Sequence, residues 1–158
     1  MSKVILHMNG DNLVMTAPNL GARFREWSQE ENKWLFTETE AAFLERIKPA
    51  GGVVVDKADI PDAKGFPDAL ELVEGNVQFS MSKAENMHSQ SLLKQIYAKL
   101  DKLDAKMIRP IGEGDTARIA QINQQKEDLR NIMANPLVGF TGTTPEELKA
   151  YVPAELEV

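Results

Sequence analysis

The stretch SKAENMHSQSLLKQIYAKLDKLDAKMIRP, residues 82–110, decides the fold class, because its apolar residues recur at alternating spacings of three and four. This heptad spacing places them along one face of an α-helix. Ser82 and Glu85 have the spacing of a capping box at its start, and Pro110 with the glycines that follow is expected to end it. The seam residues are Leu93, Ile96, Leu100, Leu103 and Met107.

A second helix is expected after residue 114. Asp115 or Thr116 can cap its start, and Asn135-Pro136 is expected to close it. A loop of about six residues between two helices of similar length predicts an antiparallel helical hairpin. The apolar positions that continue the heptad spacing are Ile119, Ile122, Leu129 and Met133.

Beside this seam lie apolar residues that the two helices do not cover if they pair only with each other. Monomeric proteins rarely leave a contiguous apolar stripe exposed, so we expect this flank to bind a partner chain. The predicted partner-binding residues are Leu92, Tyr97 and Ile108 on the first helix and Ile132 on the second.

The part of the chain before Ser82 has the period-two pattern of strands. Residues 4–8 and 13–16 flank Asn9-Gly10, a strong hairpin signal. Further hairpins are expected at 24–36 and 70–81, a strand at 53–55, and a short helix capped by Thr37 that buries Phe43, Leu44 and Ile47.

The predicted fold is therefore α+β. A β-rich module with hairpins and one short helix spans residues 1–81, the antiparallel helical hairpin spans 82–135, and a tail spans 136–158. The tail is expected to contain a short helix that begins at Thr144-Pro145, because a threonine N-cap followed by proline is a typical helix start.

Composition excludes several classes of protein. The chain has 158 residues, a formal net charge of −6 and no cysteine, so thiol catalysis, disulfides and cysteine-based zinc sites are absent. Neither half carries the basic excess expected of a nucleic-acid partner. The apolar run before Asn9 is too short for a signal peptide, and no stretch is long enough for a membrane span.

Residues that could support catalysis or metal binding are few and scattered. His7 lies in an apolar strand and His88 near a helix start, and neither has the partners of a zinc site or a triad. Asp56, Asp59 and Asp62 are crowded in one loop but do not have the calcium-loop spacing. We expect no catalytic residue, cofactor or metal, and hence no enzyme.

Four of the few aromatic residues cluster between residues 24 and 36. Such a group could stack against sugars or bases, or it could form the core of the first module. Because aromatics are scarce elsewhere, the core interpretation is favoured. The four residues are Phe24, Trp27, Trp34 and Phe36.

The segment LDAKMIRP at 103–110, GDTAR at 114–118 and DLR at 128–130 resembles a recurrent C-terminal helical hairpin. It is similar to the hairpin of bacteriophage tail-fibre assembly proteins and tail assembly chaperones. Upstream, residues 37–55 and the KGFP turn at 64–67 are similar to the short helix, strand and turn of the same proteins. The resemblance does not extend to residues 1–36 and 137–158.

This resemblance implies a non-enzymatic assembly protein that binds a phage tail or tail-fibre protein in the host cytoplasm. The alternative is a structural part of the virion tail, in the baseplate or the fibre-attachment or fibre-tip region, and a remote alternative is a glycan-binding or glycan-cleaving protein. A homo-oligomer also fits, whereas nucleic-acid and membrane partners do not. The residues expected to stabilise the hairpin are Lys106, Arg109, Pro110, Asp115 and Arg130.

Overall fold

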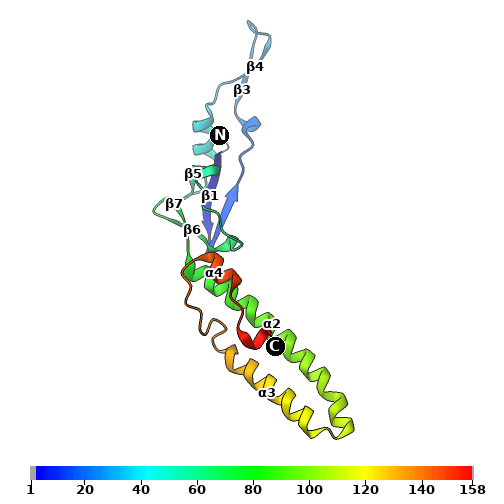
Figure 1. Ribbon diagram of the computed structural model, residues 1–158. Helices are drawn as coiled ribbons and strands as arrows, with labels where there is room; N and C mark the ends of the chain where they lie inside the picture. Colours follow the sequence, from blue (N-terminus) through cyan, green and yellow to red (C-terminus); the bar gives the residue numbers. More distant parts are fainter. Residues whose placement is uncertain (1–2, 158) are drawn as a thin grey trace. The chain divides into compact units, whose positions relative to one another are not determined.

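The computed structural model describes residues 3–157 and confirms an α+β fold (Figure 1). The chain divides into two compact units. The first contains the residues up to Ala63 together with Leu70–Ser80, and the second contains Lys64–Ala69 and the residues from Met81 onward. The predicted domain limits at residues 1 and 158 lie outside the described part of the chain.

A three-stranded antiparallel sheet organises the first unit. Its strands are β1 (Lys3–Asn9), β2 (Asn12–Thr16) and β5 (Val53–Asp56), in the order β2-β1-β5. Gly10 turns the first hairpin with a φ of +61°, a conformation that glycine adopts without strain. The Asn-Gly hairpin predicted here is confirmed.

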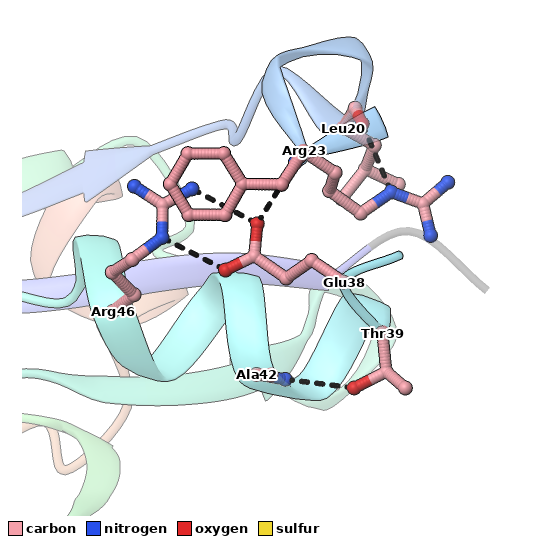
Figure 2. Close-up of polar contacts among 7 residues, drawn as sticks. Leu20, Arg23, Glu38, Thr39, Ala42 and Arg46 are labelled. Atoms are coloured by element: carbon pink, nitrogen blue, oxygen red, sulfur yellow. Dashed lines mark hydrogen bonds and ion pairs between the residues drawn. The ribbon is translucent and has the colours of Figure 1, made fainter. Parts of the chain in front are cut away.

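Helix α1 (Glu40–Ile47) packs on this sheet. It buries Phe43 and Leu44 against Ile5 of β1, as its 3.6-residue period requires. Its N-cap is Thr39 and not Thr37, and the Thr39 hydroxyl accepts a hydrogen bond from the N–H of Ala42 (Figure 2). Thr37 instead donates its N–H to the carbonyl of Phe24, which places it in the preceding hairpin.

Two separate hairpins complete the first unit: β3 (Arg25–Ser28) with β4 (Lys33–Phe36), and β6 (Leu70–Val73) with β7 (Asn76–Phe79). Short 3₁₀ turns lie at Leu20–Ala22 and Lys57–Asp59. The four aromatic residues near β3 and β4 are between 46% and 60% exposed. The prediction that they form the core of this module is wrong, because Ile5 of β1 with Phe43 and Leu44 of α1 fills that core.

Two long helices, α2 (Met81–Glu113) and α3 (Thr116–Met133), dominate the second unit and pack side by side as an antiparallel hairpin (Figure 1). Most of the predicted heptad seam contributes to its core, but Ile119 does not, and Ile132, which the prediction left out of the seam, does. Ile96 and Leu103 of α2 meet Ile122, Leu129 and Ile132 of α3, and all five side chains are buried. Partly buried side chains border this core, namely Leu93, Leu100, Met107, Met133 and Leu156.

Pro110 does not end the first helix, contrary to prediction, and lies buried inside α2. A proline in a helix removes one backbone hydrogen bond, but burial of an apolar ring on the packed side offsets part of that cost. The helix ends one turn later, where Gly114 has a φ of +70°. Gly114 and Asp115 alone separate the two helices, so the loop is also shorter than expected.

The tail forms two short helices, α4 (Pro145–Ala150) and α5 (Ala154–Glu157). Thr144 caps α4 in a full capping box with Glu147, as the sequence predicts. Helix α5 was not expected, and it contacts both α2 and α3. A 3₁₀ turn at Pro67–Ala69 also contacts α2. Among residues 3–157 no helix combines the length and apolar character needed to cross a bilayer.

Candidate partner-binding surfaces

The predicted apolar flank of the helical hairpin is only half present. Leu92 and Ile132 are buried, so the expectation that they remain open to a partner is wrong. Leu92 lies four residues before Ile96 and therefore on the inner face of α2. Ile132 belongs to the seam itself.

Tyr97 and Ile108 are exposed as expected, and Ile111 extends the same surface. Their side chains are 54%, 73% and 62% exposed. Tyr97 and Ile108 are about three turns of α2 apart, and Ile108 and Ile111 are about one turn apart. All three therefore lie on one face of the helix. We call these three residues the α2 stripe. Ile111 was missed because the helix was expected to stop at Pro110, although its spacing from Ile108 is helical.

A groove of about 510 Å³ lies between α2, α3 and α5. Its floor contains apolar side chains such as Leu103, Ile122 and Leu156, and its walls carry four cations. Three of these are lysines spaced by three and four residues, the pattern of one helical face. The cationic residues are Lys99, Lys102, Lys106 and Arg118.

Lys99 joins the groove wall on α2 to the backbone of α5. Its ammonium group donates to the carbonyls of Glu155 and Leu156, each at 3.0 Å. Partial burial lowers the pKa of Lys99, and the nearby charge of Lys106 lowers it further. A negatively charged group in the groove would relieve this repulsion, so the groove can hold anionic side chains above an apolar floor.

The residues expected to stabilise the hairpin occupy different places. Asp115 caps α3 by accepting a hydrogen bond from the N–H of Arg118 at 2.9 Å. Arg109 is not extended before the proline, because it lies within α2 and pairs with Glu113 at 2.8 Å. Lys106 lines the cationic groove, and Arg130 is exposed in the last turn of α3, where a cation suits the helix dipole.

The histidines and aspartates do not form a metal centre. The ring nitrogen Nε2 of His88 lies 2.8 Å from the carbonyl oxygen of Tyr151, and its ring packs edge-on to Phe66. His7 has a buried Nδ1 with no hydrogen-bond partner among the described residues. Within residues 3–157, no three histidine, cysteine or acidic side chains gather where they could hold a metal ion.

The chain was compared with protein-family models, curated proteins and solved structures, and no match was found. Its function is therefore inferred from its own residues and surfaces. The second unit has two candidate binding surfaces: the apolar α2 stripe and the cationic groove.

Proposed function

We propose that this chain is a non-enzymatic assembly protein of a bacteriophage tail or tail fibre, which acts in the host cytoplasm through contacts with another protein. The observation that carries the proposal is the α2 stripe. Ile108 lies within the segment at 103–130 that resembles tail-fibre assembly proteins, and Ile111 continues the same exposed face. Exposed apolar side chains that share one face of a helix favour a role in binding.

The α2 stripe and the groove are two separate contact surfaces, because Lys106 of the groove follows Tyr97 by nine residues, or about two and a half turns, and so lies on the opposite side of α2. Covering Tyr97, Ile108 and Ile111 would contribute on the order of 4 kcal/mol before the costs of association. The groove adds cations that favour acidic side chains. An apolar segment of a tail or tail-fibre protein would cover the stripe, and acidic side chains would bind in the groove as a separate contact.

Co-expression with the tail-fibre polypeptide of the same phage tests the proposal. The wild-type chain should bind the fibre polypeptide and raise its soluble yield. The double variant Tyr97→Asp, Ile108→Asp should stay folded and lose this binding, because it introduces charge into the α2 stripe. The matched control is Asn123→Asp, Asn131→Asp, which adds the same charge at exposed positions of α3. Equal binding by both variants would refute the role of the stripe.

A permanent place in the virion tail is the second candidate, and the exposed aromatic side chains of β3 and β4 favour it. A structural protein would keep such residues covered in the finished particle. Mass spectrometry of purified particles separates the two, since an assembly protein is absent from them and a structural part is present in fixed copy number.

A further inference from the structure

The β3–β4 hairpin carries a continuous aromatic and cationic face. Arg25 pairs with Phe36 and Trp27 pairs with Trp34 across the two strands, so these four side chains lie on one side of the ribbon. The two indole rings meet edge to face, with centroids 5.7 Å apart. The guanidinium of Arg23 lies 3.9 Å above the centre of the Phe36 ring, and that of Arg25 lies 5.8 Å from it.

The base of this hairpin is held firmly to its own unit. Arg46 of α1 donates two hydrogen bonds to the carboxylate of Glu38, at 2.8 and 2.9 Å (Figure 2). Glu38 also accepts the N–H of Phe24 at 3.2 Å, and the Arg46 guanidinium covers the Phe24 ring. Arg23 donates from Nε to the carbonyl of Leu20 (Figure 2). The aromatic face is thus presented from an ordered base.

The two edges of the ribbon are also open. The N–H of Thr37 donates to the carbonyl of Phe24, which makes that pair a hydrogen-bonded rung. Because rungs alternate, the Trp27–Trp34 and Arg25–Phe36 pairs are non-hydrogen-bonded, and their backbone groups point outward. Neither edge pairs with a third strand within residues 3–157. A two-stranded ribbon with open edges is a ready template for another strand.

The charge of the face is unbalanced. Arg23 and Arg25 stack on Phe36, and within the described residues neither makes an ion pair with a carboxylate. A second copy of the chain would bring four guanidinium groups to one interface, while the Glu38 carboxylate near Arg23 is already held by Arg46, and such like charges are costly when they are desolvated. A partner with acidic side chains would neutralise them.

We propose that the β3–β4 hairpin is a docking arm for an acidic, extended segment of another polypeptide, which adds to the ribbon as a third strand. Its backbone would satisfy one open edge, its carboxylates would meet Arg23 and Arg25, and its apolar side chains would cover the indoles. Polysaccharides and nucleic acids lack the backbone that this edge fits. The inference concerns a different surface from the helical hairpin and does not rest on the tail-assembly role.

The arm has a built-in reporter, because Trp27 and Trp34 are the two tryptophans of the chain. The probe is the peptide Ac-ETVTETVT-NH2, titrated at pH 7 into the full chain. Its glutamates and valines share one face of a strand, as the arginines and indoles do. We expect a saturable blue shift of tryptophan emission. The peptide Ac-KTVTKTVT-NH2 should cause none, and Ac-ETPTEPVT-NH2, which keeps the charge but lacks a backbone donor on each edge of the strand, should bind at least tenfold more weakly.

Two variants test the arginines. Arg25→Gln should weaken binding of the acidic peptide on the order of fivefold. Arg23→Glu, Arg25→Glu should abolish it and give measurable binding of the lysine peptide, with an unchanged circular dichroism spectrum. Should the double variant lose its fold, Arg25→Gln alone decides the role of charge.

Three results would overturn the proposal: no saturable shift at millimolar acidic peptide, equal binding of the lysine peptide, or equal binding of the proline peptide. The last would mean that the face recognises charge and aromatic stacking without strand addition. An anionic polysaccharide that bound in an Arg25-dependent way where the acidic peptide failed would assign the face to glycans instead.

Discussion

The β3–β4 hairpin and the α2–α3 hairpin are both pairs of antiparallel segments joined by short turns. The helical hairpin buries its apolar side chains, whereas the β3–β4 hairpin exposes them. In the helical hairpin the seam closes on itself, and Ile96, Ile122 and Leu129 are almost inaccessible. In the β3–β4 hairpin the aromatic side chains stand open on one face. Two helices can bury one stripe of each other, whereas a two-stranded ribbon cannot enclose either of its faces. An open ribbon face must therefore be covered by something else or serve as a binding surface.

Truncation of one large side chain in each hairpin tests whether one is closed and the other open. Leu129→Ala should lower the free energy of unfolding of the helical unit by about 2–5 kcal/mol, because it leaves a cavity in the closed seam. Trp34→Ala should cost less than about 1 kcal/mol, because it removes only a cross-strand ring contact. Urea unfolding followed by circular dichroism measures both.

If Trp34→Ala destabilises the helical signal as much as Leu129→Ala does, the arm is part of the protein's core. If Leu129→Ala instead lowers the free energy of unfolding only slightly, the α2–α3 seam is loosely packed.

Loss of a helix cap has the next largest expected effect. Asp115→Ala removes the acceptor for the N–H of Arg118 and should cost about 0.5–2 kcal/mol in the helical unit. The control Glu127→Ala changes an exposed carboxylate of the same helix and should stay within about 0.5 kcal/mol. The comparison of their urea midpoints checks the cap. Equal effects would mean that the two-residue turn does not depend on Asp115.

Acidification should affect the two units through different carboxylates. Hydrogen bonds from Arg46 lower the pKa of Glu38, and backbone N–H groups of Thr143 and Thr144 lower the pKa of Glu147. A folded-state pKa below the unfolded value means that each group stabilises its unit at neutral pH. This stabilisation is lost as the pH falls through the folded-state pKa.

Glu38→Gln should therefore weaken the acid dependence of tryptophan emission below neutral pH and leave the helical circular dichroism titration unchanged. Glu147→Gln should act only on the helical signal. These are the smallest of the expected effects. A Glu38→Gln variant whose emission still changes with pH as in the wild type would show that Glu38 does not hold the arm.

The sequence predicts most of the elements because their signals are local. Heptad spacing locates the helical seam, and Asn9-Gly10 locates the first hairpin. Thr144-Pro145 also locates the start of a terminal helix. The exposure of a sheet or helix face could not be predicted, because it depends on which distant parts of the chain pack on it. The cross-strand pairing of Trp27 and Trp34 puts them on one side of the ribbon, but the sequence does not show whether anything packs on that side.

The candidate surfaces were only partly predictable for similar reasons. Pro110 is a helix breaker by propensity, and its toleration in α2 depends on tertiary packing, so Ile111 was excluded from the stripe. The lysines at 99, 102 and 106 have helical spacing that could have indicated a cationic face. That they line a groove depends on α5, a four-residue helix with little signal of its own.

Acrylamide quenching of tryptophan fluorescence in the free, folded chain at pH 7 most directly tests whether the arm is an open docking surface. Both tryptophans lie on the arm, so no other region contributes to the signal. Trp27 and Trp34 should emit as largely water-exposed indoles, and acrylamide should quench them at a rate comparable to that of the urea-unfolded chain. A blue-shifted emission protected from acrylamide would contradict this account, because the chain would then already cover the face assigned to a partner.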